Sequence, residues 1–477
     1  DTDDLAAIDF VKKKVGLKIL PRLTDKESIK GALLQYQKSL KAEFGDIIEK
    51  EASALKMIGE GEEMQSEEEL KKLAEDLPVV KIVDTLLNHA IIQGASDIHI
   101  EPMDSQVVIR YRIDGLLHDA MVLPKTAAPG IVARIKVLAN LKLDEKRLPQ
   151  DGRFKIESAG EKVAFRVSTL PVYYGEKTVM RLLRESVSGF SLEGLGFHGA
   201  GLERIYAATK QRVGMILTTG PTGSGKSTTL YTILDILNEP DVNISTIEDP
   251  IEYQMARVNQ TQVKSEIGLT FASGLRSLVR QDPDIIMVGE IRDNETASLA
   301  INASLTGHLV ISTLHTNSAA GALPRLLDMK VEPFLIASTV SVIIGQRLVR
   351  RLAKSRKPFI LSKTELTELA RQVDLDRILK ILKDNKIVKT GDNWDDINFY
   401  KPAPTAESAD GYHDRIGIHE VLEVTESIKQ LIISNATSDE IEKRAKEEGM
   451  MTMLEDGIVK AVQGITTIEE VLRVTTE

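Results

Sequence analysis

The sequence predicts an α/β protein built around a parallel sheet with helices on its faces. From residue 201 onward, short apolar runs alternate with helical patterns, which is typical of parallel strands joined by crossover helices. Two of these runs, at 215–217 and 285–288, are apolar without interruption, as expected of strands buried on both faces. A glycine-rich turn follows the first run and leads directly into "KSTTLYTILDIL", a helical pattern.

Length and composition set the outer limits. The 477 residues suffice for roughly two to four domains with sizeable cores. A hydrophobic content of 42% and a charged content of 28% match an ordinary soluble globular protein. The net charge of -10 argues against a general nucleic-acid binder, which usually has a basic surface.

The chain also lacks several features of membrane and secreted proteins. No apolar run approaches the roughly 18 to 20 residues needed to span a bilayer, and no signal peptide opens the chain. The absence of cysteine excludes disulfides and cysteine-ligated zinc or iron–sulfur sites, and it agrees with a cytosolic location. The chain begins with Asp1 rather than methionine, which leaves room for residues before it.

Residues 1–77 are predicted to form a small helical region followed by a linker. Up to about residue 58 the chain carries amphipathic helical patterns such as "LAAIDFVKKKVG". The segment 59–76, "GEGEEMQSEEELKKLAED", is acidic and has few apolar residues, so we interpret it as a linker or a solvated helix.

Residues 78–190 are predicted to form an α+β domain. An amphipathic helix, "VVKIVDTLLNHAIIQG", follows Pro78, and strand patterns come after it. The pair Asp114-Gly115 signals one hairpin, and a second is expected across "FKIESAGEKVAFRV". The glycine-rich segment 191–200 is interpreted as an interdomain hinge.

The α/β core is expected at 201–350, and the region 351–477 is expected to be mainly helical. The latter holds a charged stretch, 354–395, and a loop-like segment near 400–414.

The turn after the first buried strand fits the phosphate-binding pattern G-x-x-x-x-G-K-[ST]. Its glycines allow backbone N–H groups to curve around phosphate oxygens, and the helix start adds a positive dipole end. Lys226 supplies a cation for the β- and γ-phosphates, and Ser227 offers an oxygen to Mg²⁺. We predict that a nucleotide is bound by Gly220, Pro221, Thr222, Gly223, Ser224, Gly225, Lys226, Ser227 and Thr228.

Acidic residues follow two further strands. Glu290 ends the strand 285–288 and is placed to orient the attacking water or water bound to Mg²⁺. Glu248, Asp249 and Glu252 cluster after another β-branched strand, either as a solvated turn or, as we favour, as acids that hold Mg²⁺ or position the nucleophile. The candidate Mg²⁺ ligands, partly through water, are Ser227, Glu248 and Glu290.

The stretch "TGHLVISTLHTN" (306–317) predicts a strand flanked by two histidines. A histidine near a strand end commonly packs or caps, and this remains the alternative for His308 and His315. Because His315 emerges at the same sheet edge as Glu290, we predict that it senses the γ-phosphate. Neither histidine belongs to a zincin-type pair, so we expect no histidine metal site.

Five motifs in order resemble those of the secretion ATPases of type II secretion and type IV pilus machines. They are "SDIHIEP", "GPTGSGKSTTL", "TIEDPIEY", "GLRSLVRQDPDIIMVGEIRD" and "TGHLVISTLHTN". The similarity covers about 78–350 and resumes at 411–424. On this resemblance the Walker A box is Gly220–Ser227, the Asp box Glu248–Glu252, the Walker B box Ile285–Glu290 and the His box His308–His315.

The resemblance implies a Mg²⁺-dependent ATPase with a RecA-like core behind a PAS-like sandwich domain. It further implies a homohexameric ring at the cytoplasmic face of the inner membrane, peripheral to the bilayer, which moves pilin subunits through a platform protein. Assembly-type members also carry two cysteine pairs that bind zinc. Here the interval 352–410 has no cysteine, and Asp414 replaces the usual glycine before Arg415, so we expect a different, helical insert without zinc.

Motors of this kind commonly use an arginine to balance charge on the transferred phosphoryl group. Arg276, Arg280 and Arg292 flank the Walker B strand, and Arg153 and Arg166 lie in the sandwich domain. Each could instead be a surface partner for an acidic side chain. Because members of the resembled family bring sandwich-domain arginines onto the γ-phosphate, we predict that Arg153 and Arg166 act there, and we keep Arg280 as a further catalytic candidate.

The function expected from the resemblance is an ATP-hydrolysing motor of pilus assembly or type II secretion. About 77 residues precede the sandwich domain, and "AIDFVKKKVGLKIL" resembles the N-terminal docking region of assembly-type members, whereas retraction ATPases are shorter. A retraction ATPase remains the alternative within the family. A nucleotide-sensing module without turnover and a DNA-translocating ring are alternatives from other classes, and the acidic balance counts against the ring.

Overall fold

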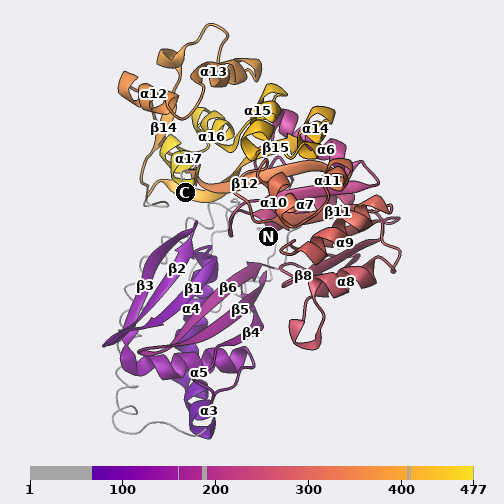
Figure 1. The fold of residues 1–477 in the computed structure, drawn as a ribbon. Helices are drawn as coiled ribbons and strands as arrows, with labels where there is room; N and C mark the ends of the chain where they lie inside the picture. Colours follow the sequence, from indigo (N-terminus) through magenta and orange to yellow (C-terminus); the bar gives the residue numbers. More distant parts are fainter. Residues whose placement is uncertain (1–66, 159–160, 185–190, 406–407, 409, 476–477) are drawn as a thin grey trace, which may run out of the picture.

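The computed structural model describes residues 67–158, 161–184, 191–405, 408 and 410–475 (Figure 1). Residues 1–66, which hold most of the predicted N-terminal docking region, lie outside the described residues. None of the described helices combines the length and the apolar character that crossing a membrane requires.

The N-terminal part of the described chain is a six-stranded antiparallel sheet in the order β3-β2-β1-β6-β5-β4. Two helices share one apolar core with the sheet, and Figure 1 shows this domain as a body of its own. Its elements are α4 (Leu77–Ile92), β1 (Asp97–Pro102), β2 (Gln106–Ile113), β3 (Leu116–Pro124), η1 (Lys125–Ala127), α5 (Ala128–Leu138), β4 (Gln150–Ser158), β5 (Glu161–Val172) and β6 (Gly175–Arg184).

Both predicted hairpins are confirmed. β2 and β3 pair up to Ile113 and Leu116, so the turn consists of Asp114 and Gly115. These two residues have φ angles of 50° and 88°, the left-handed values that a tight hairpin turn requires. β4 and β5 form the second hairpin.

Part of the acidic segment is a packed helix rather than a linker. Helix α3 (Glu67–Glu75) turns Leu70 and Ala74 toward Ala133 and Leu143, and all four side chains are buried. The two apolar residues stand four apart, which places them on one helix face. The charged side chains Glu68, Lys71, Lys72 and Glu75 are exposed, so α3 has a solvated face as well as a packed one.

The predicted hinge is partly anchored. Leu192 and Phe197 are buried in the core of the following domain, and the Phe197 ring stacks on His419 with 3.6 Å between ring centroids. Gly417 N also donates to Leu195 O at 3.2 Å. Residues 191–198 are therefore part of the second domain, and this packing does not support a hinge within them.

The second domain is built on a seven-stranded sheet in the order β15-β12-β7-β11-β10-β8-β9. All neighbouring strands are parallel except the edge pair β12 and β15. The strands are β7 (Gly214–Thr219), β8 (Ile244–Glu248), β9 (Val258–Gln262), β10 (Ile285–Val288), β11 (Leu309–Leu314), β12 (Val340–Leu352) and β15 (Tyr412–Glu423).

Helices cover both faces of this sheet, so neighbouring strand residues enter opposite cores. Ile285 and Met287 of β10 belong to one core, whereas Ile286 and Val288 belong to the other. The predicted fold class, an α/β protein with a parallel sheet buried on both faces, is confirmed. The covering elements are α6 (Gly199–Thr209), α7 (Lys226–Leu237), η2 (Ser265–Ile267), α8 (Phe271–Leu278), α9 (Asn294–Leu305), α10 (Ala322–Asp328), α11 (Pro333–Thr339), α14 (Glu426–Ile433) and α15 (Ser438–Glu447).

The C-terminal region contributes more strand structure than predicted. A boundary at residue 350 falls inside β12, and β15 adds to the same sheet although about sixty residues separate the two strands. Ile416 and Ile418 of β15 are buried. The expectation of a mainly helical region after 350 therefore missed the strand that completes the core sheet.

The cysteine-free insert between β12 and β15 folds around apolar side chains. Leu369, Ile378, Leu382 and Phe399 share a core with residues of the C-terminal helices. Figure 1 shows this part of the chain next to α16 and α17. The elements of this part are β13 (Arg356–Phe359), α12 (Lys363–Ala370), α13 (Leu375–Asp384), η3 (Trp394–Asp396), β14 (Phe399–Pro402), α16 (Met453–Val462) and α17 (Ile468–Thr475).

Candidate active site

The phosphate-loop sequence forms a tight turn between β7 and α7. Gly220, Gly223 and Gly225 have φ angles of 144°, 80° and 90°, which residues with a side chain rarely adopt. A Cβ atom on Gly220 would also collide with the carbonyl oxygen of Gln346. The glycines are therefore required by the backbone path, and the turn leaves α7 starting directly behind the loop, as phosphate binding requires.

Lys226 lies over this loop. Its Nζ donates to Gly220 O at 2.7 Å and to Pro221 O at 2.9 Å. Burial lowers the pKa of Lys226, and the charge of Glu290 opposes that shift. Among the described residues, the buried hydroxyl of Ser224 has no hydrogen-bond partner. A cation over the loop and an unused hydroxyl donor in a glycine turn fit a bound phosphate.

Gln346 supports the loop from β12, and the sequence reasoning missed it. Its Nε2 donates to Ser224 O at 2.8 Å, and its Oε1 accepts from Thr229 Oγ1 at 2.9 Å. A polar residue within the apolar strand pattern "VSVIIGQRLV" was the available signal, because a buried amide needs partners.

Glu290 and His315 come together at the carboxyl edge of the sheet. β10 and β11 are parallel neighbours, so the residues that follow them meet at one edge. His315 Nε2 lies 3.0 Å from Glu290 Oε2, and Arg292 Nε lies 2.6 Å from the same oxygen. The Glu290 side chain is 11% exposed, whereas that of Arg292 is 65% exposed. Thus the predicted neighbourhood of Glu290 and His315 is present, with an exposed arginine added.

Glu248 lies at the same edge but is engaged by neutral donors. Its carboxylate accepts hydrogen bonds from Tyr231 Oη, from Thr246 Oγ1 at 2.6 Å and from Gln260 Nε2 at 3.1 Å. Burial raises the pKa of Glu248, and these hydrogen bonds oppose the shift. Tyr231 was not foreseen, because nothing in the pattern of helix α7 distinguishes it from a core aromatic.

The other two acids of this cluster differ in exposure. Asp249 is exposed, and Glu252 is half-buried. Burial raises the pKa of Glu252, while the charges of Arg181 and Arg166 oppose that shift. Glu252 in the loop after β8 is therefore within electrostatic reach of arginines of the N-terminal domain.

Those arginines form one row across the N-terminal sheet. Arg153 on β4 is paired with Arg166 on β5, which is paired with Arg181 on β6. Arg181 in turn is opposite Asp97, and their side chains are 3.0 Å apart. Arg153 and Arg166 are exposed, so the structure places both predicted arginines on one surface and adds Arg181 to them.

Two candidates lie away from this edge. Arg280 precedes β10, and the next residue, Gln281, accepts at its carbonyl from Asn243 Nδ2 (3.1 Å) at the start of β8. Arg280 is therefore at the amino ends of the strands, opposite Glu290 within one chain. His308 precedes β11, and its Nδ1 lies 2.8 Å from Ala303 O, a capping contact.

Arg276, another arginine that flanks the Walker B strand in sequence, forms an ion pair with Glu295.

Among the described residues, a Mg²⁺ ligand would be a single side chain rather than one member of a cluster. Within the described ranges, no group of three or more His, Cys, Asp or Glu residues is arranged to hold a metal ion. Ser227 is exposed at the start of α7, next to Lys226. One hydroxyl ligand completed by phosphate and water oxygens is an arrangement that suits Mg²⁺.

Together the phosphate loop, the parallel sheet and the acid–histidine pair define a P-loop nucleotide hydrolase. The family model described as "Type II/IV secretion system protein" matches residues 72–473, and the chain belongs to this family. The predicted family is thereby confirmed.

Two relatives match almost the whole chain. The chain is 43% identical over 475 residues to the type II secretion system protein E of Xanthomonas campestris, covering 100% of this chain and 80% of that protein. It is 40% identical over 478 residues to the type IV pilus assembly ATPase PilB of Myxococcus xanthus, covering 99% and 81%.

Solved structures agree with the fold. The crystal structure of the pilus retraction motor PilT with bound ADP is 26% identical, with a TM-score of 0.56, covering 82% of this chain and 96% of that one. The Legionella pneumophila ATPase DotB has a TM-score of 0.58 at 22% identity, covering 83% and 95%.

Proposed function

We propose that this chain is a Mg²⁺-dependent ATPase motor that drives polymerisation of pilin or pseudopilin subunits in type IV pilus assembly or type II secretion. The names of the relatives bear out the expected function at the level of an ATPase of pilus assembly or secretion. The observation that carries hydrolysis is Glu290, a nearly buried carboxylate held by His315 at the sheet edge that the phosphate loop shares.

The chemistry assigned to this edge follows from its side chains. We assign Lys226 to the phosphate oxygens, because its ammonium group already lies over the loop. On nucleotide binding it would replace its hydrogen bonds to the carbonyls of Gly220 and Pro221 with bonds to phosphate. We assign Glu290 to orient the attacking water, with His315 contacting its carboxylate. Mg²⁺, when bound next to Ser227, would supply neutralisation of phosphate charge; Glu248 and Glu290 would hold its water ligands.

The assembly we propose is a homohexameric ring at the cytoplasmic face of the inner membrane, bound to a platform protein. In this assembly we assign Arg153 and Arg166, which are exposed in the row on the N-terminal sheet, to a nucleotide held by a core domain. Such an arginine balances charge on the transferred phosphoryl group.

Retraction is the second candidate within the family, since the PilT structure covers most of the chain. Assembly or secretion is favoured, because relatives with these names are 40% and 43% identical over 99% and 100% of the chain. A sensing module without turnover is disfavoured by the intact pair of Glu290 and His315.

The proposal is tested by steady-state phosphate release from ATP with and without Mg²⁺, for the parent chain and for Glu290→Gln. We expect turnover only in the parent and only with Mg²⁺. Equal release by both proteins would refute hydrolysis at this site. Deleting the protein in its host and imaging filaments and secreted products then separates assembly, secretion and retraction.

A further inference from the structure

Glu420 carries a carboxylate in the C-terminal part of the core sheet. None of the catalytic roles proposed above uses it. It lies on β15 and is 5% exposed. Its Oε1 accepts from the backbone N–H of Ala319 at 2.5 Å, and its Oε2 accepts from Met453 N at 3.4 Å. Ala319 belongs to the loop that begins with His315, so a side chain of β15 holds the loop of the candidate active site.

The sheet is shaped to let this carboxylate reach the loop. Glu420 is paired with Gly345 of β12. A Cβ atom at Gly345 would lie 2.7 Å from Glu420 Cγ, closer than real Cβ atoms approach, and 3.1 Å from Ala319 N, which is a tight contact. Only glycine at this position leaves room for the side chain to cross the neighbouring strand. The contact between Glu420 and Ala319 thus also depends on the glycine at position 345 of β12.

The loop is held at a second point by the strand that leads into the phosphate loop. Thr219, the last residue of β7, accepts from Thr316 N at 3.0 Å through its hydroxyl oxygen. Gly345 is also the partner of Thr219 in the sheet. His315 therefore stands at the start of a loop clamped at Thr316 and at Ala319.

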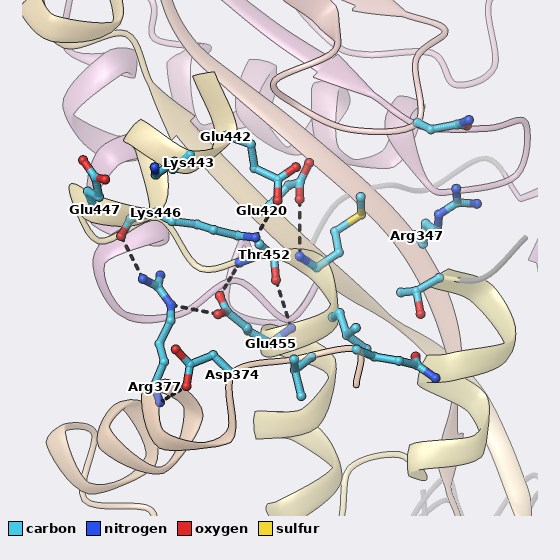
Figure 2. Close-up of a pocket in the computed structure, with 16 residues that line it drawn as sticks. Arg347, Asp374, Arg377, Glu420, Glu442, Lys443, Lys446, Glu447, Thr452 and Glu455 are labelled. Carbon is cyan, nitrogen blue, oxygen red and sulfur yellow. Dashed lines mark hydrogen bonds and ion pairs between the residues drawn. The ribbon is translucent and has the colours of Figure 1, made fainter. Parts of the chain in front are cut away.

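The far side of Glu420 faces a cavity of about 790 Å³ between α13, α15 and α16. Figure 2 shows the carboxylates of Glu420 and Glu442 at one end of this cavity. The charge of Glu442 opposes ionisation of Glu420, and that of Lys446 favours it. Met453, the other contact of Glu420, is the first residue of α16. The carboxylate thus joins the C-terminal helices to the loop of His315.

We propose that Glu420 is a positioning residue for ATP hydrolysis: it fixes the loop 315–319 so that His315 stays on Glu290, and it links this pair to the C-terminal helices. The inference rests on the proposed hydrolysis at Glu290. It assigns Glu420 no contact with nucleotide, so its loss should lower kcat and leave nucleotide affinity nearly unchanged.

Two conservative variants separate the length of the Glu420 side chain from its carboxyl chemistry. Glu420→Gln keeps an acceptor oxygen at the same distance, whereas Glu420→Asp keeps the carboxyl group but withdraws its oxygens by about 1.5 Å. Because displacement of a catalytic group by about 1 Å can cost about 10²-fold in rate, we expect kcat to fall about 10- to 100-fold in the Asp variant. The Gln variant should retain more kcat than the Asp variant. Both should bind a fluorescent ATP analogue within about threefold of the parent.

A double variant tests whether Glu420 acts through His315. If it does, His315→Ala combined with Glu420→Asp should be no slower than His315→Ala alone, because contacts in one network are not additive. Losses that multiply, equal losses of affinity and kcat, or an Asp variant with the kcat of the parent would each overturn the proposal. Glu423→Gln, an exposed glutamate of the same strand, is the control and should match the parent.

Failure of the inference on Glu420 can be distinguished from failure of the proposed function. If Glu290→Gln releases phosphate as fast as the parent, hydrolysis at this site is refuted. If turnover requires Glu290 but is the same in Glu420→Asp and the parent, only the inference on Glu420 fails.

Discussion

His315 Nε2 lies 3.0 Å from Glu290 Oε2, which joins the ends of two parallel strands through their side chains. Arg292 Nε also lies 2.6 Å from Glu290 Oε2. The Glu290 side chain is nearly buried, whereas both of its partners are exposed, His315 to 49% and Arg292 to 65%. Two side chains thus hold the Glu290 carboxylate, and His315 does so from the end of the neighbouring strand.

Glu290→Gln should retain ATP binding and lose turnover by about 10²- to 10⁴-fold, the range expected when a catalytic acid or base is removed. The amide has nearly the same shape but accepts no proton. Phosphate release and binding of a fluorescent nucleotide analogue measure the two effects separately. Lys226→Ala is the contrasting variant, because it removes the cation over the phosphate loop and should abolish binding.

Turnover near the parent rate in the Gln variant would show that Glu290 is not the catalytic carboxylate. Glu248 would then be the next candidate, since it ends the neighbouring strand β8. Its carboxylate accepts hydrogen bonds from the neutral side chains of Tyr231, Thr246 and Gln260, and burial raises its pKa.

Arg153→Ala and Arg166→Ala should each slow hydrolysis strongly while ATP affinity falls only modestly. Both arginines lie in one exposed row on the N-terminal sheet, and an arginine that meets the transferred phosphoryl group is worth about 10³ to 10⁵ in rate. Single-turnover hydrolysis with saturating ATP measures the loss. Arg280 stands at the other end of β10, so Arg280→Ala should affect hydrolysis only if a neighbouring subunit uses it.

The control for this series is Arg147→Ala. Arg147 lies in the same domain, is 88% exposed and contacts only Glu145 two residues before it in the chain, as far as the described ion pairs extend. It should hydrolyse ATP like the parent. An Arg153 or Arg166 variant that behaves like this control would remove that arginine from the mechanism.

The sequence was informative where structure is local. The phosphate loop, the strand at 285–288 and the turn at Asp114 and Gly115 depend on contiguous residues whose backbone demands are specific, so they were predictable. The meeting of Glu290 and His315 was also predictable, because parallel strands end at one edge of a sheet.

Contacts between distant segments were not predictable in this way. The pairing of β12 with β15 crosses an insert whose length hides the register, so neither the seventh strand nor the contact between Glu420 and Ala319 could be inferred. Gln346 gave a weak signal as a polar residue in an apolar strand, but its target, Ser224, lies 122 residues away. Burial of Leu70 was hidden by the acidic residues around it.

The insert at 352–410 should depend on apolar packing and not on zinc. Leu382 is fully buried in its core, so Leu382→Ala should lower the free energy of unfolding of this region by about 2–5 kcal/mol. Trp394, the single tryptophan of the chain, stacks near Phe399 and reports this unfolding by fluorescence. Ile360→Ala, at a 50% exposed position of the same insert, is the control and should change little.

Elemental analysis completes this test. The prediction is less than stoichiometric zinc and an unchanged unfolding midpoint after chelation. One zinc per chain, lost together with the stability of the region on chelation, would contradict it.

The last prediction concerns the pH dependence of stability around Glu420. Burial raises the pKa of Glu420 from 4.5 to about 7, with Glu442 adding to the shift and the N–H groups of Ala319 and Met453 opposing it. Below pH 4.5 the carboxyl is protonated in both the folded and the unfolded chain, so it costs nothing. Between pH 4.5 and about 7 the unfolded chain releases the proton and the folded chain keeps it, so stability falls as pH rises.

Above about pH 7 this cost is constant, at about 3 kcal/mol on the scale of 1.36 kcal/mol per pKa unit. Glu420→Gln has no proton to release, so its free energy of unfolding relative to the parent should increase from pH 5 to 7 and stay level from pH 8. Urea unfolding of the C-terminal region, followed by Trp394 fluorescence at each pH, measures this difference. Glu423→Gln, at the exposed last residue of β15, should run parallel to the parent across the range. If Glu420→Gln also runs parallel, the carboxyl titrates alike in both states, and its burial against Ala319 and Met453 carries no electrostatic cost.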